Sequence, residues 1–315
     1  MNKAVEQLRT EPALAWKMTV KVLGAGEDSP KASRAQAEVR DAPLVRNLIA
    51  KCDRQHSPYK KWDGAHWVLS ILGDLGYPAG DEALRPLMED TYDCWLSETH
   101  IKNHLRVIDG RVRRCGSQEG YAAWCSLRLG FADSRTDELV SRLLKWQWPD
   151  GGWNCDKHPE ADSSSFMETL IPLRALALYA KISGDAKAKA AAERAAEVFL
   201  TRQLFKRRGD GQVMNQHFVL LHYPCYWHYD ILFGLKVLTE AGFIGDPRCA
   251  AALDLLESKR LPDGGFPAEE SYARPTRPQL SGYSPVSWGG TSKKMMNPFI
   301  TADALYVLRM VNRLK

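Results

Sequence analysis

Three carboxylic acids stand at the starts of predicted helices, where an acid could transfer a proton. Asp162 and Glu168 flank the start of one apolar helix, and Asp230 lies near the start of another. Burial among aromatic side chains raises the pKa of a carboxylic acid, which can then protonate an alkene or an epoxide. We therefore expect Asp162, Glu168 and Asp230 to be the catalytic residues. The alternative is that they cap their helices by accepting backbone N–H groups.

Aromatic and cationic side chains are concentrated around the same helix starts. Aromatic π faces can stabilise a carbocation, and helix N-termini together with basic loops favour an anionic group. We expect the substrate-binding residues to be Trp62, His66, Trp67, Tyr121, Tyr226, Trp227, His228, Trp288, Arg114 and Arg208. The alternative is that the aromatic residues belong to the core and that the cations only solvate the surface.

Histidines and cysteines are clustered in two loops. Cys155 and His158 share one loop, and His222, Cys225 and His228 share another. Such loops can supply a tetrahedral zinc site, although no pair has the spacing of a zinc finger. We expect no cofactor, and keep zinc bound by Cys225, His222 and His228 as an alternative.

The composition is typical of a globular protein without membrane spans. Of its 315 residues 44% are hydrophobic and 26% charged, and the net charge of +5 is too small to indicate nucleic-acid binding. No apolar run is long enough to cross a bilayer, and the N-terminus does not have the pattern of a signal peptide. Seven scattered cysteines without a CxxC pair favour free thiols and a cytoplasmic location.

The elements that would position these residues are helical hairpins. Apolar helices are predicted over 63–75, 117–129, 165–182, 225–241 and 299–313, and amphipathic partners over 81–97, 134–148, 185–205 and 246–260. The first four apolar helices stop at Gly76, Gly130, Gly184 and Gly242, at intervals of 54, 54 and 58 residues. Enclosed apolar helices alternating with amphipathic ones predict an inner and an outer ring, either closed as a barrel or left open as a solenoid.

One turn sequence recurs along the chain. Pro149-Asp150-Gly151-Gly152 follows Trp148 and precedes Trp153, and Pro262-Asp263-Gly264-Gly265 repeats it before Phe266. Asp-Gly and Gly-Gly allow the positive φ that a tight reversal needs. A turn that returns at this spacing indicates a repeat architecture.

The tryptophan-flanked turn is similar to the QW motif of squalene and oxidosqualene cyclases. The matching residues are Trp146, Gln147, Asp150, Gly151, Gly152 and Trp153. The hairpin period resembles the α/α-toroid superfamily, which also contains protein prenyltransferase β subunits. The resemblance covers residues 57–315. It implies an all-α chain folded as a single α/α toroid of the α6/α6 type, with 1–56 as a helical pair that completes the ring.

The sequence departs from both families at their chemical motifs. Where squalene cyclases carry Asp-x-Asp-Asp, only Asp162 and Glu168 are acidic, and the chain has room for one toroid where the cyclases have two. The stretch from Pro224 to His228 is similar to the context of the prenyltransferase zinc cysteine. The next inner helix, however, begins at Met296-Asn297-Pro298-Phe299, without a histidine.

The leading hypothesis is an isoprenoid-processing enzyme similar to a terpenoid cyclase, with acid-initiated carbocation chemistry in an aromatic cavity. The alternatives are a zinc-dependent enzyme similar to prenyltransferases, and a non-catalytic toroid that binds a ligand or a protein. The expected partner is an isoprenoid or another anionic amphiphile, with peripheral membrane contact as a further expectation. The loop over 266–298 would be either a lid or a plug.

Overall fold

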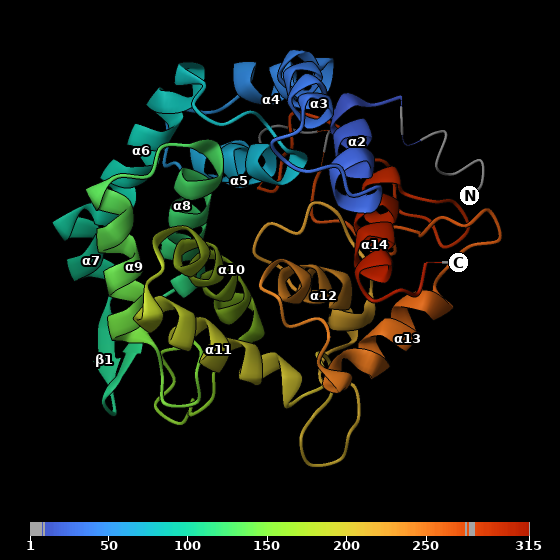
Figure 1. Cartoon of the computed structure of the whole chain (residues 1–315). Helices are drawn as coiled ribbons and strands as arrows, with labels where there is room; N and C mark the ends of the chain where they lie inside the picture. The colour runs from blue at the N-terminus through green and yellow to red at the C-terminus, as the bar shows by residue number, and fades with distance from the viewer. Residues whose placement is uncertain (1–7, 9, 275, 277–280, 315) are drawn as a thin grey trace.

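The helices of this chain close into a double ring. The structure is a computed structural model that describes residues 8, 10–274, 276 and 281–314. Each inner helix contacts the next one, and the last contacts the first, so the ring in Figure 1 is closed. In chain order the inner helices are α2 (Pro12–Lys17, continued by the π-helical turn η1, Met18–Val22), α5 (Ala65–Leu75), α8 (Gly116–Leu129), α10 (Phe166–Ser183), α12 (Ile231–Glu240) and α14 (Pro298–Met310).

The outer ring consists of helices that return along the inner ones. They are α3 (Pro30–Asp41) with α4 (Pro43–Ala50), α6 (Arg85–Leu96), α9 (Ser134–Trp146), α11 (Ala186–Leu200) and α13 (Ala250–Ser258). Each of α3, α6, α9, α11 and α13 packs against the inner helix that precedes it. Short 3-10 turns lie at η2 (Glu82–Leu84), η3 (Gln216–Val219) and η4 (Pro247–Cys249). The fold is therefore an α/α toroid, as predicted.

The glycines that end the inner helices have the left-handed conformation that the sequence predicted. Gly76, Gly130 and Gly184 are the C-caps of α5, α8 and α10, with φ of 82°, 78° and 74°. Gly242 follows the C-cap of α12 and has a φ of 86°. Residues with a side chain rarely adopt this backbone conformation. Glycine therefore allows each helix to stop where its outer partner begins.

The repeated Asp-Gly-Gly sequence forms the same turn twice. Trp148 N donates to Gly152 O at 2.8 Å, and Gly151 N donates to Trp148 O at 2.9 Å. In the second copy Leu261 N and Gly265 O are 2.9 Å apart, as are Gly264 N and Leu261 O. Each turn leads from an outer helix towards the next inner one.

The structure differs from the predicted elements in three places. Helix α12 begins at Ile231 and not at residue 225, because Asp230 caps it by accepting from Phe233 N at 2.8 Å. The short helix α7 (Glu98–His104) and the hairpin of β1 (Arg106–Ile108) and β2 (Arg111–Arg113) were not predicted, since they are too short to show a periodicity. The helical pair expected over 1–56 has its first described helix at Pro12, and residues 1–7 and 9 lie outside the described part.

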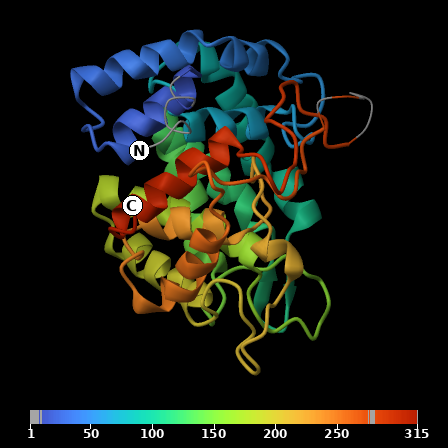
Figure 2. The same ribbon diagram turned by 90° about the vertical axis from the view of Figure 1, so that its right-hand side faces the viewer.

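The two ends of the toroid differ. In Figure 2 the long loops that lead into the inner helices lie on the right, and the C-terminus of the chain lies on the left.

Within the described residues, no helix combines the length and the apolar character needed to cross a membrane. All seven cysteines are free, as expected.

Candidate functional site

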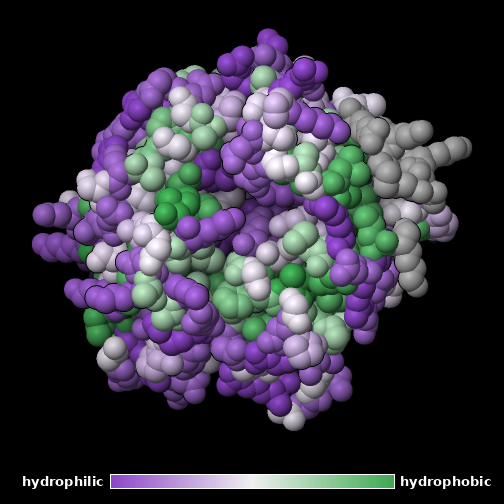
Figure 3. Space-filling view, viewed as in Figure 1, coloured by the Kyte–Doolittle hydropathy of each residue, from purple (hydrophilic) through white to green (hydrophobic). Residues whose placement is uncertain are grey.

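A cavity of about 530 Å³ lies at the centre of the inner ring. Figure 3 shows it as a hollow with hydrophilic residues at its bottom. Its lining comes mostly from the C-terminal halves of the inner helices, for example Asp74 of α5, Arg128 of α8 and Glu240 of α12. The cavity therefore opens at the end of the ring opposite the loops that enter the inner helices. A volume of several hundred Å³ is typical of small-molecule sites.

The floor of the cavity is a closed ring of four ion pairs. Lys17 Nζ lies 2.8 Å from Asp74 Oδ2 and 2.8 Å from Asp303 Oδ1. Lys236 Nζ lies 2.5 Å from Asp74 Oδ1 and 2.8 Å from Asp303 Oδ2. Each lysine thus bridges both aspartates, and the four residues come from four different inner helices, α2, α5, α12 and α14.

Arg174 of α10 extends this network to a third carboxylate. Its Nη2 donates to Asp74 Oδ1 at 3.1 Å, and its Nε and Nη2 form a bidentate pair with Glu240 at 2.6 and 2.9 Å. The guanidinium also lies 3.8 Å from the centre of the Trp124 ring. Such a bidentate pair fixes both side chains in orientation as well as in charge.

The network keeps the carboxylates of Asp74 and Glu240 ionised. Burial alone would raise the pKa of Asp74, but Lys17, Lys236 and Arg174 outweigh it and hold that pKa well below its usual value. Burial also opposes ionisation of Glu240, and Arg174 nevertheless lowers the pKa of Glu240. These two carboxylates are hydrogen-bond acceptors and not proton donors near neutral pH.

The mouth of the cavity carries cations that are not fully engaged. Lys21 pairs with Glu27 at 2.6 Å, and Arg128 Nη1 lies 3.9 Å from the same carboxylate. Arg128 Nη2 is buried without a hydrogen-bond partner among the described residues, and Lys181 is exposed. Six cationic and four acidic side chains line the cavity in total. Helix C-termini carry about half a negative charge each, so the inner helices themselves favour cations at this end.

The opposite end of the ring is closed by packed aromatic side chains. Trp62 stacks on Tyr226 with ring centres 4.0 Å apart, and Trp67 meets both rings edge-on. Tyr121 donates its hydroxyl to Tyr226 O at 2.5 Å. These four predicted substrate-binding residues are at most 4% exposed. The structure brings them together, but against one another and not around an open cavity.

The loop over 266–298 lies across this closed end. Trp62 N donates to Tyr283 O at 2.8 Å, which ties the loop to the entry of α5. Trp288 is 2% exposed and donates to Ser284 Oγ at 2.9 Å. Ser284, Val286 and Trp288 of the loop are thus buried at this end, whereas residues 289–291 and 293–295 are exposed.

The predicted histidines are buried in the same layer. His66 accepts a hydrogen bond from Trp95 Nε1 at 3.1 Å, and burial lowers its pKa to about 3. His228 is stacked between Trp227 and Tyr272, with ring centres 4.1 and 3.4 Å away. Burial lowers the pKa of His228 to about 3 as well, so both rings are neutral.

The two predicted arginines lie apart from each other. Arg114 is 3% exposed and pairs with the buried Glu119 at 2.8 Å. Arg208 is exposed and donates to Thr201 Oγ1 at 3.0 Å. Neither of them lines the central cavity.

The three predicted catalytic acids are in different surroundings. Asp162 is exposed in the loop before α10. Asp230 is fully buried, caps α12 and accepts from His222 N at 2.9 Å. Glu168 is 9% exposed; burial raises its pKa, although two hydrogen bonds from Ser117 oppose the shift.

The residues of the zinc alternative are partly brought together. Ligand atoms of His222, Cys225 and Asp230 lie within 4.8 Å of one another. Asp230, and not the expected His228, is the third residue of this group. Asp230 already pairs with His222 Nδ1 at 2.9 Å, and both side chains are fully buried. His222 Nε2 has no hydrogen-bond partner among the described residues.

Sequence reasoning missed the charged floor of the cavity. The sequence does carry a signal, because each floor residue is a lone charge inside an apolar helix. Such charges are almost never buried unless they are paired, and here each partner comes from another helix. The segments are Ala13 to Lys17, Ile71 to Leu75, Ile171 to Ala177, Phe233 to Leu238 and Phe299 to Leu305.

Comparison with known proteins gives no family for this chain. No protein-family model matches the sequence, and no curated protein matches it. Solved structures that are similar to it include two α/α toroids. One is an unsaturated glucuronyl hydrolase variant with the oligosaccharide dGlcA-Glc-Rha-Glc. It is 13% identical in sequence, the match covers 95% of this chain and 84% of that chain, and the TM-score is 0.44. The other is a protein from Actinoplanes: 19% identity, 95% and 89% covered, TM-score 0.40.

Proposed function

We propose that this toroid binds a small, anionic, polyhydroxylated molecule, such as a sugar acid or a sugar phosphate, in its central cavity. The observation that carries the proposal is the charged lining, in which cations outnumber carboxylates six to four. Arg128 Nη2 and the exposed Lys181 supply donors for a carboxylate or a phosphate. The floor supplies paired acceptors and donors for hydroxyl groups.

The wall of the cavity supports the same class of ligand. Leu127, Leu178 and Tyr306 line it beside the charged groups. A pyranose ring has apolar C–H faces and polar edges, so it matches a site where apolar side chains alternate with charged ones. A purely apolar ligand would leave the ion pairs of the floor desolvated without compensation.

The geometry gives less support to the isoprenoid-cyclase hypothesis. Acid-initiated chemistry needs a protonated acid and an apolar aromatic pocket. In the central cavity the pKa of Asp74 and that of Glu240 are both lowered. The aromatic residues expected to form the pocket fill the other end of the ring with their own contacts.

Calorimetric titration of the purified protein tests the proposal. Glucuronate and glucose 6-phosphate provide the charge, neutral glucose is the matched uncharged probe, and decyl phosphate and farnesyl diphosphate represent amphiphiles. We expect the two sugar anions to bind at least about 10-fold more tightly than glucose, which corresponds to about 1.4 kcal/mol. Equal binding of glucose, or binding of the two amphiphiles alone, would contradict the proposal.

A pair of charge-reversal variants localises the site. Lys181 lies at the mouth of the cavity, and Lys187 is an equally exposed lysine at the start of α11, away from the cavity. Lys181→Glu should weaken binding of glucuronate about 5- to 10-fold, as expected for one partly exposed charge interaction turned repulsive. Lys187→Glu should leave the affinity unchanged. Equal effects of the two variants would place binding elsewhere.

A further inference from the structure

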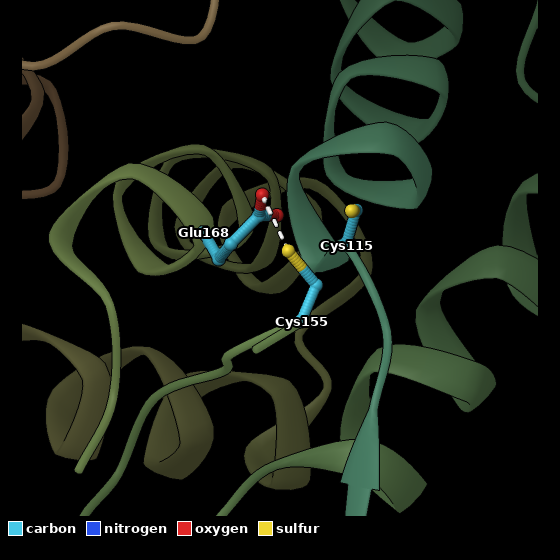
Figure 4. Close-up of side chains that lie close together, drawn as sticks. All are labelled: Cys115, Cys155 and Glu168. Carbon is cyan, nitrogen blue, oxygen red and sulfur yellow. Dashed lines mark hydrogen bonds between the residues drawn. The ribbon is translucent and has the colours of Figure 1, made fainter. Parts of the chain in front are cut away.

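Two thiols and a carboxylate meet at the closed end of the toroid. Cys115 directly precedes α8, Cys155 follows the Asp-Gly-Gly turn, and Glu168 lies in the first turn of α10. Figure 4 shows the three side chains converging on the space between α8 and α10. Their ligand atoms all lie within 4.8 Å of one another.

The spacing of the three ligand atoms fits a tetrahedral metal ion. Zinc binds sulfur at about 2.3 Å and carboxylate oxygen at about 2.0 Å, so two such ligands of a tetrahedral ion lie about 3.5 Å apart. The distance from Cys155 Sγ to Glu168 Oε1 is 3.5 Å. Small side-chain rotations can bring Cys115 Sγ into the same shell, since all ligand atoms are within 4.8 Å.

The backbone holds the two cysteine segments side by side. Arg113 and Asn154 form a parallel bridge, and Arg114 N donates to Asn154 O at 3.3 Å. Arg114 and Asn154 directly precede Cys115 and Cys155, and Arg113 lies two positions before Cys115. The positions of the thiols therefore depend on this backbone pairing.

The carboxylate is oriented by a separate pair of donors. Ser117 N and Ser117 Oγ donate to Glu168 Oε2 at 3.1 and 2.8 Å. These bonds leave Oε1 directed at Cys155. Metal-binding carboxylates are commonly fixed by such outer hydrogen bonds. Both thiols are partly exposed, so an ion from solution can reach them.

We propose that Cys115, Cys155 and Glu168 bind a zinc ion, with the fourth coordination position left to water or a ligand. The thiols would release their protons to solvent as the ion binds. Three protein ligands and one open position are the usual arrangement of catalytic zinc sites, whereas structural sites use four. The site does not depend on the ligand proposed for the central cavity, because none of its residues lines that cavity.

Metal analysis of the purified full chain tests this proposal. We expect about one zinc per chain after expression with added zinc, and a thiolate-to-metal absorption band with tetrahedral d–d bands when cobalt replaces it. Cys155→Ser should abolish the stoichiometric zinc. Ser117→Ala, which removes the hydroxyl that orients Glu168, should weaken zinc affinity about 10- to 100-fold. Far-UV circular dichroism of each variant verifies folding, and Cys115→Ser provides the same test if Cys155→Ser does not fold.

Two control variants make the experiment specific. Cys94 is another partly buried cysteine, on the outer helix α6, and Cys94→Ser should retain the zinc. Cys225→Ser should also retain it. Loss of zinc in Cys225→Ser with retention in Cys155→Ser would assign the metal to the cluster of His222, Cys225 and Asp230 and overturn the proposal. A disulfide between Cys115 and Cys155 in protein purified in reducing buffer would also overturn the proposed zinc site. So would the absence of zinc from the wild-type protein.

Discussion

Lys17 Nζ lies 2.8 Å from Asp303 Oδ1, although 286 residues separate the two along the chain. Lys17 ends α2, the first inner helix, and Asp303 lies in α14, the last one. The pair therefore joins the two ends of the ring. Both residues are almost fully buried, at 2% and 7% exposure. The same contact closes the fold and forms part of the floor of its cavity.

Removing the charge of Lys17 should destabilise the protein strongly. Lys17→Met leaves Asp74 and Asp303 buried with one lysine between them, and loss of one partner of a buried pair costs about 3–5 kcal/mol. Lys21→Met is the matched control, because Lys21 pairs with the exposed Glu27 and such pairs contribute about 0–1 kcal/mol. Urea unfolding gives both values. Similar losses of unfolding free energy in the two variants would show that the buried ion pairs of Lys17 do not stabilise the protein more than the exposed pair of Lys21.

Removing the negative charge of Glu27 should strengthen the binding of a sugar acid. Glu27 engages Lys21 and Arg128 at the cavity mouth, so Glu27→Gln frees these cations. We expect glucuronate to bind about 2- to 5-fold more tightly, since exposed ion-pair interactions are worth about 0.5–1 kcal/mol. Glu38→Gln, on the exposed face of α3, is the control. Calorimetry compares the two, and weaker binding by Glu27→Gln would argue against an anionic ligand.

The stability of the protein should fall in mild acid because of His66. Its pKa is lowered by burial to about 3, from about 6.5 in an unfolded chain. The folded state thus favours the neutral ring, and this contribution is complete above pH 6.5 and is lost as the pH falls towards 3. His66→Asn keeps an acceptor for Trp95 and should remove up to about 1.4 kcal/mol per pH unit of this dependence.

Unfolding free energies measured between pH 7 and pH 4 give that slope. His104 is an exposed histidine of α7, and His104→Asn should follow the wild-type curve. A His66→Asn curve parallel to the wild-type one would show that His66 does not titrate with unfolding in this range.

Gln147 should be needed to fasten the first Asp-Gly-Gly turn. Its Nε2 donates to Gly151 O at 2.7 Å and to Ala191 O at 2.8 Å, and Arg194 donates to its Oε1. The side chain thus links the turn to helix α11. Gln147→Ala should cost about 1–3 kcal/mol, because it removes partners from several partly buried groups. Thermal or urea unfolding measures the loss, and the exposed Gln212→Ala should change stability by less than about 0.5 kcal/mol.

The local features of this fold could be predicted from the sequence. The stop glycines and the repeated Asp-Gly-Gly turn are short-range signals, because a positive φ or a tight reversal needs particular residues wherever it occurs. Gly76, Gly130 and Gly184 are helix caps at the predicted positions. Their regular spacing predicted a repeat of helical hairpins, and the resemblance of the Trp-flanked turn to the QW motif added the closed toroid. The short hairpin of β1 and β2 was missed, since three-residue strands carry almost no periodicity.

Only the tertiary structure decided which residues face one another and which end of the ring is open. The aromatic residues at the inner helix starts could equally have lined a pocket, but Trp62 and Tyr226, 164 positions apart in the sequence, stack directly and close that end. The charges of the cavity floor come from separate helices and are stabilised by pairing with one another and with Arg174. Likewise Cys115 meets Cys155 and Glu168 only because α8 and α10 pack side by side. Periodicity along a chain specifies which face of a helix is buried, whereas contacts between distant helices depend on how the ring closes.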